Sequence, residues 1–230
     1  MKRILTKILV LLFVGSLPAQ YSQPTPRVRR ASDDYGVPLF QFQIYNFASP
    51  QNPGKTRVDF HFALVNSLLA FIVDKDQFKA GYEIYVIILN SKNEIIAFKS
   101  AKNQVIVNEF EQTNARINPH QHTLSFLLAP GDYKYRIRVN DDESGIVIER
   151  EDRFTVRDFH PGVIRMSDLV FVDKMDSTES GFINSPNLNG VFNDINSDFI
   201  AYFEVYPPVN SDTVSIAATI FDSESNKIFY

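Results

Sequence analysis

Apolar and polar residues alternate along short segments between residues 36 and 158, and turn residues separate these segments. Alternation with a period of two places side chains on opposite faces of a β-strand. The pattern predicts strands over 39–46, 56–65, 69–73, 78–90, 94–98, 104–110, 121–128, 132–139 and 146–156. No window has the periodicity of an amphipathic helix, so we expect an all-β domain, a sandwich or a barrel.

The turn at 127–133 favours the sandwich. Pro130 fixes one backbone angle and Gly131 tolerates a positive one, so the chain reverses direction there. Tyr133 enters the next strand, where its hydroxyl can bond back across the corner, as in immunoglobulin-like domains. We therefore predict an Ig-like or fibronectin-type-III-like antiparallel β-sandwich over residues 36–158.

The hairpin at 132–156 predicts its own register. Strand 132–139 has an apolar face and a cationic face, and the following strand carries glutamates. If a four-residue loop joins Asn140 to Gly145, the expected cross-strand pairs are Arg136–Glu149, Lys134–Glu151 and Ile137–Ile148. Each such pair contributes about 0.2–1 kcal/mol, so these pairs select the register rather than hold the domain together.

A Pro161-Gly162 breaker marks the end of this domain, and residues 159–230 form a second β-rich unit. Strands are expected at 164–172, 199–206 and 213–221, with an irregular Asn- and Gly-rich stretch at 181–198 and a final hairpin. These are fewer strands than a complete sandwich needs. Either the unit is small and leans on the first domain, or it is incomplete and the chain is a fragment, which is the interpretation we favour.

Residues 1–19 have the pattern of a secretory signal peptide. Lys2, Arg3 and Lys7 precede the apolar run 8–14, and Ala19 supplies a small residue for cleavage. The run is shorter than the roughly 20 apolar residues that span a membrane, so we expect export without a transmembrane anchor. The destination is then the periplasm, the outer membrane or the extracellular space. Residues 20–35 are polar and proline-containing, which predicts a flexible leader.

Composition narrows the functional classes. The chain has no Cys, so it has no disulfides, no thiolate nucleophile and no lipoprotein cysteine. Without disulfides, the fold must be stabilised by the packing of its hydrophobic core. The 20 Phe and 10 Tyr of the chain can bury large apolar areas there. A net charge of -4 provides no basic face for nucleic acid.

Catalytic motifs are missing from the sequence. There is no Gly-x-Ser-x-Gly elbow, no glycine-rich phosphate loop and no Cys. Paired carboxylates, as in glycoside hydrolysis, converge in space and leave no mark in the sequence. We expect no enzymatic activity, and we assign no catalytic, cofactor-binding or metal-binding residues and no cofactor.

Three groups of residues are candidate metal ligands, and we assign none of them as a metal site. His120 and His122 share a strand face, but His61 and His160 are the only other histidines and neither is placed near them. Residues 194–198 open like a calcium loop, but Phe199 stands where a loop of this kind needs Gly. The acidic stretches 141–143 and 173–179 could hold calcium at a sandwich end, although a solvated turn is the preferred interpretation.

Two routes to binding remain. Exposed aromatic rings can stack on sugars, but we assign the aromatic residues of the second unit to its core: Phe182, Phe192, Tyr202, Phe203 and Tyr206. An edge strand can instead accept a partner's strand, because its backbone groups are unpaired.

Five segments together resemble the N-terminal β-rich region of GWxTD domain-containing proteins: 78–84, 128–133, 140–141, 154–156 and 165–169. The resemblance covers roughly residues 36–230. It implies an exported protein of Gram-negative bacteria, a family with no established activity, and no functional residues carry over. The Gly-Trp-x-Thr-Asp motif is absent because the chain has no Trp, which implies that this module lay downstream.

These observations together predict a non-catalytic protein of the bacterial envelope that mediates protein–protein association. The alternative is a carbohydrate-binding module of a larger secreted protein. A calcium-stabilised adhesin is a third possibility.

Overall fold

The computed structural model describes residues 27–30, 40–160, 162–178, 181–188, 200–208, 215–217, 219–221 and 227–229. The predicted signal peptide and the loop at 194–198 lie outside these residues. Within them, no helix is long and apolar enough to cross a membrane.

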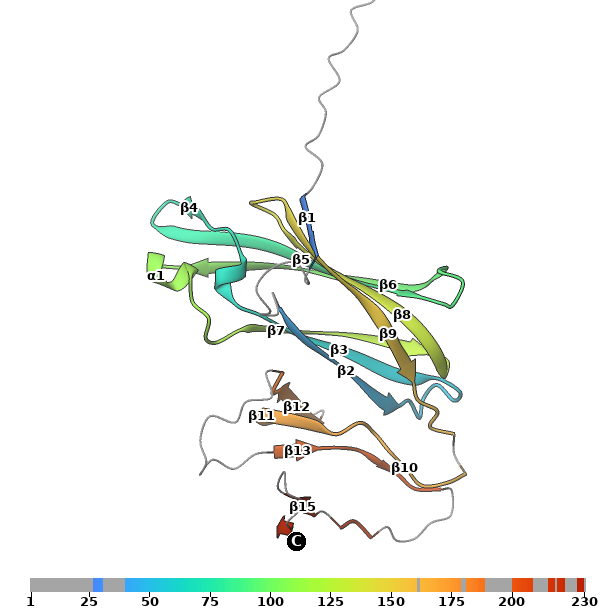
Figure 1. Ribbon diagram of the computed structural model, residues 1–230. Coiled ribbons are helices and arrows are strands. Elements are labelled where there is room, and N and C mark those ends of the chain that lie inside the picture. Colours follow the sequence, from blue (N-terminus) through green and yellow to red (C-terminus); the bar gives the residue numbers. More distant parts are fainter. Residues whose placement is uncertain are drawn as a thin grey trace, which may run out of the picture.

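The first domain is a sandwich of two β-sheets (Figure 1). The larger sheet has the order β1 (Arg27–Arg30), β9 (Ile146–Val156), β8 (Gly131–Asp141), β5 (Gln77–Leu89). Two more strands pair with β5: β6 (Ile95–Val107) along its length, and β4 (Ile72–Asp74) with its first residues. The smaller sheet has the order β2 (Gln41–Ala48), β3 (Thr56–Leu64), β7 (His120–Leu128). All these pairs are antiparallel except β1–β9, so the predicted antiparallel sandwich is confirmed.

Most predicted strands agree with the structure within three residues at their ends, and one pair does not. The segments 94–98 and 104–110 were predicted as separate strands, but they belong to the single strand β6. The polar residues between them lie on a strand at the edge of the sheet, where Lys99, Ser100 and Lys102 are exposed while Ala101 packs against the core. The helices near this sandwich are single turns, η1 (Asn66–Leu68) and α1 (Phe110–Thr113).

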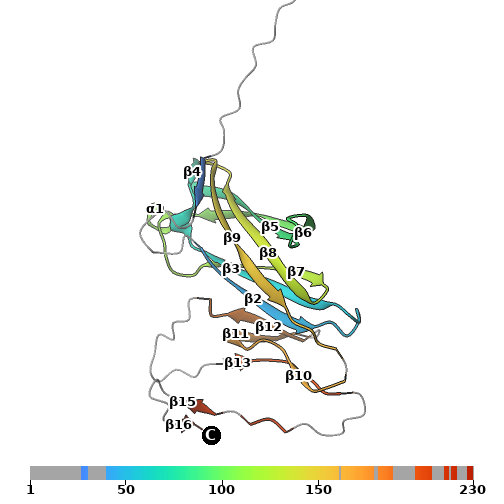
Figure 2. The same ribbon diagram turned by 45° about the vertical axis from the view of Figure 1, so that its right-hand side comes forward.

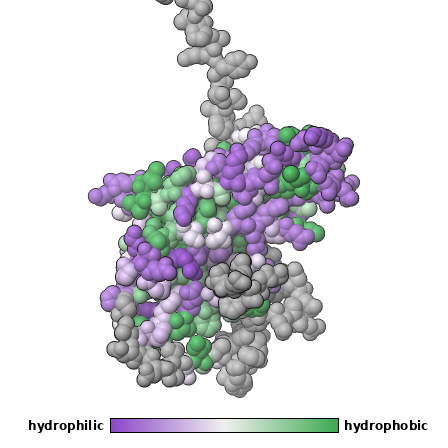
Figure 3. Space-filling view, turned by 180° about the vertical axis from the view of Figure 1, so that it is seen from behind, coloured by the Kyte–Doolittle hydropathy of each residue, from purple (hydrophilic) through white to green (hydrophobic). Residues whose placement is uncertain are grey.

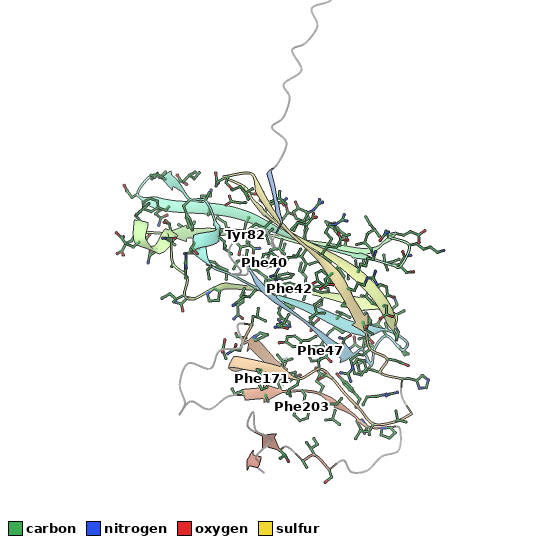
Figure 4. All side chains as sticks on the ribbon, in the orientation of Figure 1. Phe40, Phe42, Phe47, Tyr82, Phe171 and Phe203 are labelled. Atoms are coloured by element: carbon green, nitrogen blue, oxygen red, sulfur yellow. The ribbon has the colours of Figure 1, made fainter. Side chains whose placement is uncertain are left out.

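Aromatic rings fill the space between the two sheets (Figure 4). Phe60 on β3 is completely buried, and it meets the edges of Phe126, Tyr135 and Phe154 at centroid distances of 5.6, 6.1 and 5.6 Å. Edge-to-face pairs add about 0.5–1.5 kcal/mol each beyond the area they bury. This packing is how a domain without disulfides obtains a specific core.

The tyrosine corner is present as expected. The Tyr133 hydroxyl donates a hydrogen bond to the Ala129 carbonyl oxygen at 3.0 Å. This bond links the entry of β8 to the turn before it.

The register of the β8–β9 hairpin differs from the prediction by two residues. Arg136 lies opposite Glu151 and Arg138 opposite Glu149, and the closing pair is Asn140–Val147. The turn is longer than expected because the Asp141 carboxylate accepts backbone N–H groups inside it. A shift of two residues leaves every side chain on its predicted face, so the apolar and charged faces are as predicted.

The predicted leader is wrong for four residues. Arg27–Arg30 form β1, which pairs in parallel with the first residues of β9. The pattern gave no sign of this strand because it has four residues, of which three are arginines and one is apolar.

In the described part of the second unit there are three small sheets. The first has the order β12 (Gly181–Pro186), β11 (Val170–Thr178), β13 (Ile200–Tyr202); the second pairs β10 (Arg165–Met166) with β14 (Val205–Tyr206); the third pairs β15 (Ile220–Phe221) with β16 (Lys227–Phe229). The predicted strand 164–172 is therefore two strands. The acidic stretch 173–179 was predicted as a loop, but it belongs to β11 as far as Thr178. Part of the predicted irregular stretch is β12, which completes a hairpin with β11.

The second unit lies against the first sandwich. In both ribbon views, sheet β12–β11–β13 runs below sheet β2–β3–β7 (Figures 1 and 2). Phe47 lies between β2 and β11, on the opposite side of the small sheet from Phe40 (Figure 4). One face of the small sheet is thus covered by the large sheet. The second unit covers part of the other face, along β2 and β3, while Gln121, Thr123 and Leu127 on β7 are exposed.

We predict that Tyr133→Phe lowers the free energy of unfolding by about 1 kcal/mol, the net value of one hydrogen bond. The ring contacts remain, so the loss isolates the hydroxyl. Urea denaturation followed by circular dichroism measures it. Tyr45→Phe is the matched control, since burial and the charge of Asp168, and no hydrogen bond within the described residues, act on the Tyr45 hydroxyl. An equal loss in both variants would contradict the assignment.

Candidate functional site

Strand β6 forms a free edge of the large sheet. It has 13 residues and pairs along its length with β5. No other strand among the described residues pairs with it. Its second row of backbone N–H and C=O groups is therefore open to a partner.

Large apolar side chains are exposed on this strand. Ile95, Ile96, Phe98 and Ile106 have exposed fractions of 67%, 48%, 53% and 52%. Figure 3 shows apolar patches among hydrophilic side chains on one face of the molecule. Ile95, Ile96 and Phe98 lie close together at the start of the strand, and Ile106 lies near its other end. Neighbouring exposed apolar residues are typical of interaction surfaces, whereas single ones are common on any surface.

The centre of β6 is cationic. Lys99 and Lys102 are its two charged residues, and the strand has no carboxylate. The Lys99 ammonium lies 5.6 Å from the centre of the Phe126 ring. Lys102 forms an exposed ion pair with Asp142 at 3.2 Å. Lysines that point inward or lie on an edge discourage pairing between identical strands.

Beside the edge, the outer face of the sheet carries an aromatic pair. The rings of Tyr85 and Phe98 have centroids 6.0 Å apart and planes inclined by 33°. The Tyr85 hydroxyl donates to the Glu83 carboxylate, and this hydrogen bond lowers the pKa of Glu83. The surface therefore combines flat rings with an ionised acceptor.

His120 and His122 lie on β7, and each forms a hydrogen bond with a different side chain. His122 Nε2 lies 2.5 Å from the Tyr82 hydroxyl, and His120 Nε2 lies 2.7 Å from Asn66 Oδ1. Burial lowers the pKa of both imidazoles, which favours their neutral forms. Among the described residues, no three His, Asp or Glu side chains gather as a metal ion would require.

The acidic turn at 141–143 has a structural role. The buried Asp141 carboxylate accepts N–H groups from Glu143, Ser144 and Ala70, at 2.9, 3.1 and 2.6 Å. Ala70 precedes β4, so this side chain ties two loops together. Its oxygens are occupied by the backbone, which explains the residue without calcium.

The junction between the two units is held by a hydrogen-bonded cluster. Asp168 Oδ2 accepts the backbone and side-chain N–H groups of Asn46 at 2.7 and 2.9 Å. Its other oxygen accepts Arg157 Nη1 at 2.6 Å. Arg157 also donates its backbone N–H to Asn46 Oδ1 at 3.2 Å, which closes the cluster.

A second cluster lies beside it. Glu204 accepts hydroxyl hydrogens from Tyr202 and Tyr206 at 2.9 and 2.5 Å, and an N–H of Arg57 at 3.3 Å. The Arg57 guanidinium also lies over the Phe47 ring, 4.4 Å from its centre. Tyr202 and Tyr206 were predicted as core of the second unit, and the structure places them at the contact with the first.

Sequence reasoning missed both the free edge of β6 and the junction. The edge could have been suspected from the apolar residues 95, 96 and 98 followed by two lysines and no acid. The polar pairs of the junction are far apart in sequence, for example Asn46 and Asp168. No local pattern could have joined them.

Comparison with known proteins adds no relative. No protein-family model matches the chain, and no curated protein matches it.

The tyrosines predict a loss of stability at high pH. The pKa of Tyr202 is raised to about 12, mainly by burial and also by its hydrogen bond to Glu204. Burial raises the pKa of Tyr82 to about 12. A folded-state pKa above the unfolded value of about 10 means that the neutral hydroxyl stabilises the fold. This contribution is complete below pH 10 and is lost as the pH rises from 10 through 12.

Tyrosinate absorbance and unfolding free energy, both measured between pH 8 and 12, check this prediction. Tyr202→Phe should lose less stability over that interval than the wild-type protein. Identical losses in the two proteins would contradict it. The chain has no Trp, so the absorbance change belongs to tyrosine alone.

Proposed function

We propose that this chain is an exported, non-catalytic protein of the bacterial envelope that binds other proteins by accepting a β-strand along β6. The observation that carries the proposal is the outer edge of the 13-residue strand β6, which no other described strand pairs with and which carries four exposed large apolar side chains. Export rests on the sequence of residues 1–19, and the envelope location also on the resemblance to GWxTD domain-containing proteins.

Strand addition explains how this surface would work. Backbone hydrogen bonds from an added strand give affinity that does not depend on sequence, and alternate side chains give specificity. Ile95, Ile96 and Phe98 would contact apolar residues at one end of the partner, and Ile106 at the other. The added strand would also remove these side chains from water, which is the main favourable term.

The charge of β6 selects the partner's chemistry. Lys99 and Lys102 favour a strand with Asp or Glu opposite its centre. A second copy of β6 would bring four lysines together with no carboxylate between them, so self-pairing is disfavoured. The ion pair of Lys102 with Asp142 is exposed and worth at most about 1 kcal/mol, so a partner carboxylate can replace it.

Selection from a display library of 11-residue extended peptides tests the proposal. Segments with apolar ends and an acidic centre should be enriched. Their binding should slow hydrogen exchange of amides within residues 95–107. The paired substitution Lys99→Glu and Lys102→Glu should weaken an acidic peptide about tenfold or more, because attraction becomes repulsion.

Arg116→Glu is the control for charge, since Arg116 is exposed and lies outside the strand. It should leave binding unchanged. Enriched peptides that bind without protecting β6, or that tolerate the charge reversal, would contradict the proposal.

Carbohydrate binding is the second candidate, and the Tyr85–Phe98 pair favours it. Flat aromatic faces bordered by hydrogen-bonding groups can stack on sugar rings. On a glycan array, binding should disappear with Tyr85→Ala. It should persist with Phe110→Ala, which removes an exposed ring from the separate Phe78–Phe110 pair. Equal effects of the two changes, or no glycan bound, would exclude this function.

A further inference from the structure

We propose that the junction between the two units contains a second binding site, for a small apolar molecule with one carboxylate. The site is a pocket of about 400 Å³. It lies where the turn after β2 and the corner at Pro130 meet β14 and residues 158–160, 163 and 165 of the connection between the units. Its volume lies within the range of about 300–1,000 Å³ typical of small-molecule sites.

The pocket wall is apolar. Two aromatic rings, Phe159 and Tyr206, and two valines, Val163 and Val205, contribute to it. Prolines from both units complete it: Pro50, Pro53, Pro130 and Pro207. Proline has no N–H to leave unsatisfied and a fixed φ, so these positions present a dry and stiff surface.

Contacts behind the wall hold its rings in place. The Tyr206 hydroxyl accepts the Ala48 N–H at 2.9 Å and donates to Glu204 at 2.5 Å. Phe159 packs edge-on against Tyr206 at 5.4 Å and 78°, and the Arg157 guanidinium lies 5.2 Å from its ring centre. A pocket already fixed in shape binds with a smaller loss of entropy.

Two positively charged side chains line the same pocket, and they favour a ligand with a negative charge. Lys55 comes from the first unit and Arg165 from the second. Neither forms an ion pair with any residue that the structure describes. Among the described residues of the lining, Asp158 alone is acidic, and its carboxylate accepts the His160 backbone N–H at 2.9 Å. The excess of positive charge complements a carboxylate attached to an apolar body.

This site is independent of β6, so either proposal can fail alone. Both units contribute to the wall, and the ligand would therefore bind only the docked arrangement. Binding should raise the stability of the junction in proportion to the logarithm of ligand concentration.

Two fluorescent probes of the same ring system test the proposal on the intact chain. One is 1-anilinonaphthalene-8-sulfonate, which is anionic, and the other is N-phenyl-1-naphthylamine, which is neutral. Both should bind, and decanoate should displace them better than decanol does. With Lys55→Gln and Arg165→Gln combined, affinity for the anionic probe should fall about tenfold, and affinity for the neutral probe should change less than about twofold.

Val163→Trp should fill the pocket and abolish binding of both probes. Ile164→Trp is the matched control, because Val163 and Ile164 are neighbours with exposed fractions of 52% and 54% and only Val163 lines the pocket. Circular dichroism checks that the variants fold. The glutamine variants alter surface groups only and keep the test valid if the Trp variant does not fold.

Three results would overturn the proposal. The first is retention of both probes by a folded Val163→Trp protein. The second is an equal effect of the glutamine substitutions on the anionic and neutral probes. The third is displacement by decanol as effective as by decanoate.

Discussion

The small sheet β2–β3–β7 packs one face against the large sheet and part of the other face against the second unit, and the arrangement of the rest of the structure depends on these two contacts. On one face of β3, Val58, Phe60 and Phe62 are completely buried against the large sheet. On the other face, Arg57 and Asp59 lie under the second unit. A strand that alternates in this way carries polar side chains into a contact, and buried polar groups are stable only when they are hydrogen-bonded. The clusters around Asp168 and Glu204 meet that requirement, and they also fix the position of the second unit. On this strand, Asp59 Oδ1 departs from the requirement, since it is buried with no hydrogen-bond partner among the residues that the structure describes.

The first sandwich could be predicted from the sequence because its signals are local. Alternating residues gave the strands, and the segment around Tyr133 gave the corner with its hydrogen bond. The β8–β9 register was wrong by two residues because it depended on the length of one turn. Asp141 sets that length by accepting N–H groups from Glu143 and Ser144, and no alternation pattern contains that information. The faces were nevertheless right, because strands have a period of two.

The second unit and the candidate site were harder to predict because they depend on long-range contacts. Asn46 and Asp168 are each ordinary polar residues in the sequence, and only folding brings them together. Likewise, the composition of β6 does not state that its far side is free. Strand order decides which strand is at an edge, and strand order is a property of the whole sheet. The same holds for Arg27–Arg30, which pair through the backbone with a strand more than a hundred residues away.

Arg157 lies at the start of the connection between the two units, a position where linked domains usually have a flexible linker. Its carbonyl oxygen accepts the Thr56 hydroxyl at 2.6 Å, and its N–H donates to Asn46, both in the first unit. Its guanidinium reaches forward to Asp168 and to the Met166 carbonyl oxygen at 2.9 Å, both in the second. A single residue thus links the two units, because its backbone is hydrogen-bonded to the first unit and its side chain to the second. A force that separates the two units would act first on the few hydrogen bonds of Arg157. These bonds would break before the aromatic core of the first domain is disturbed.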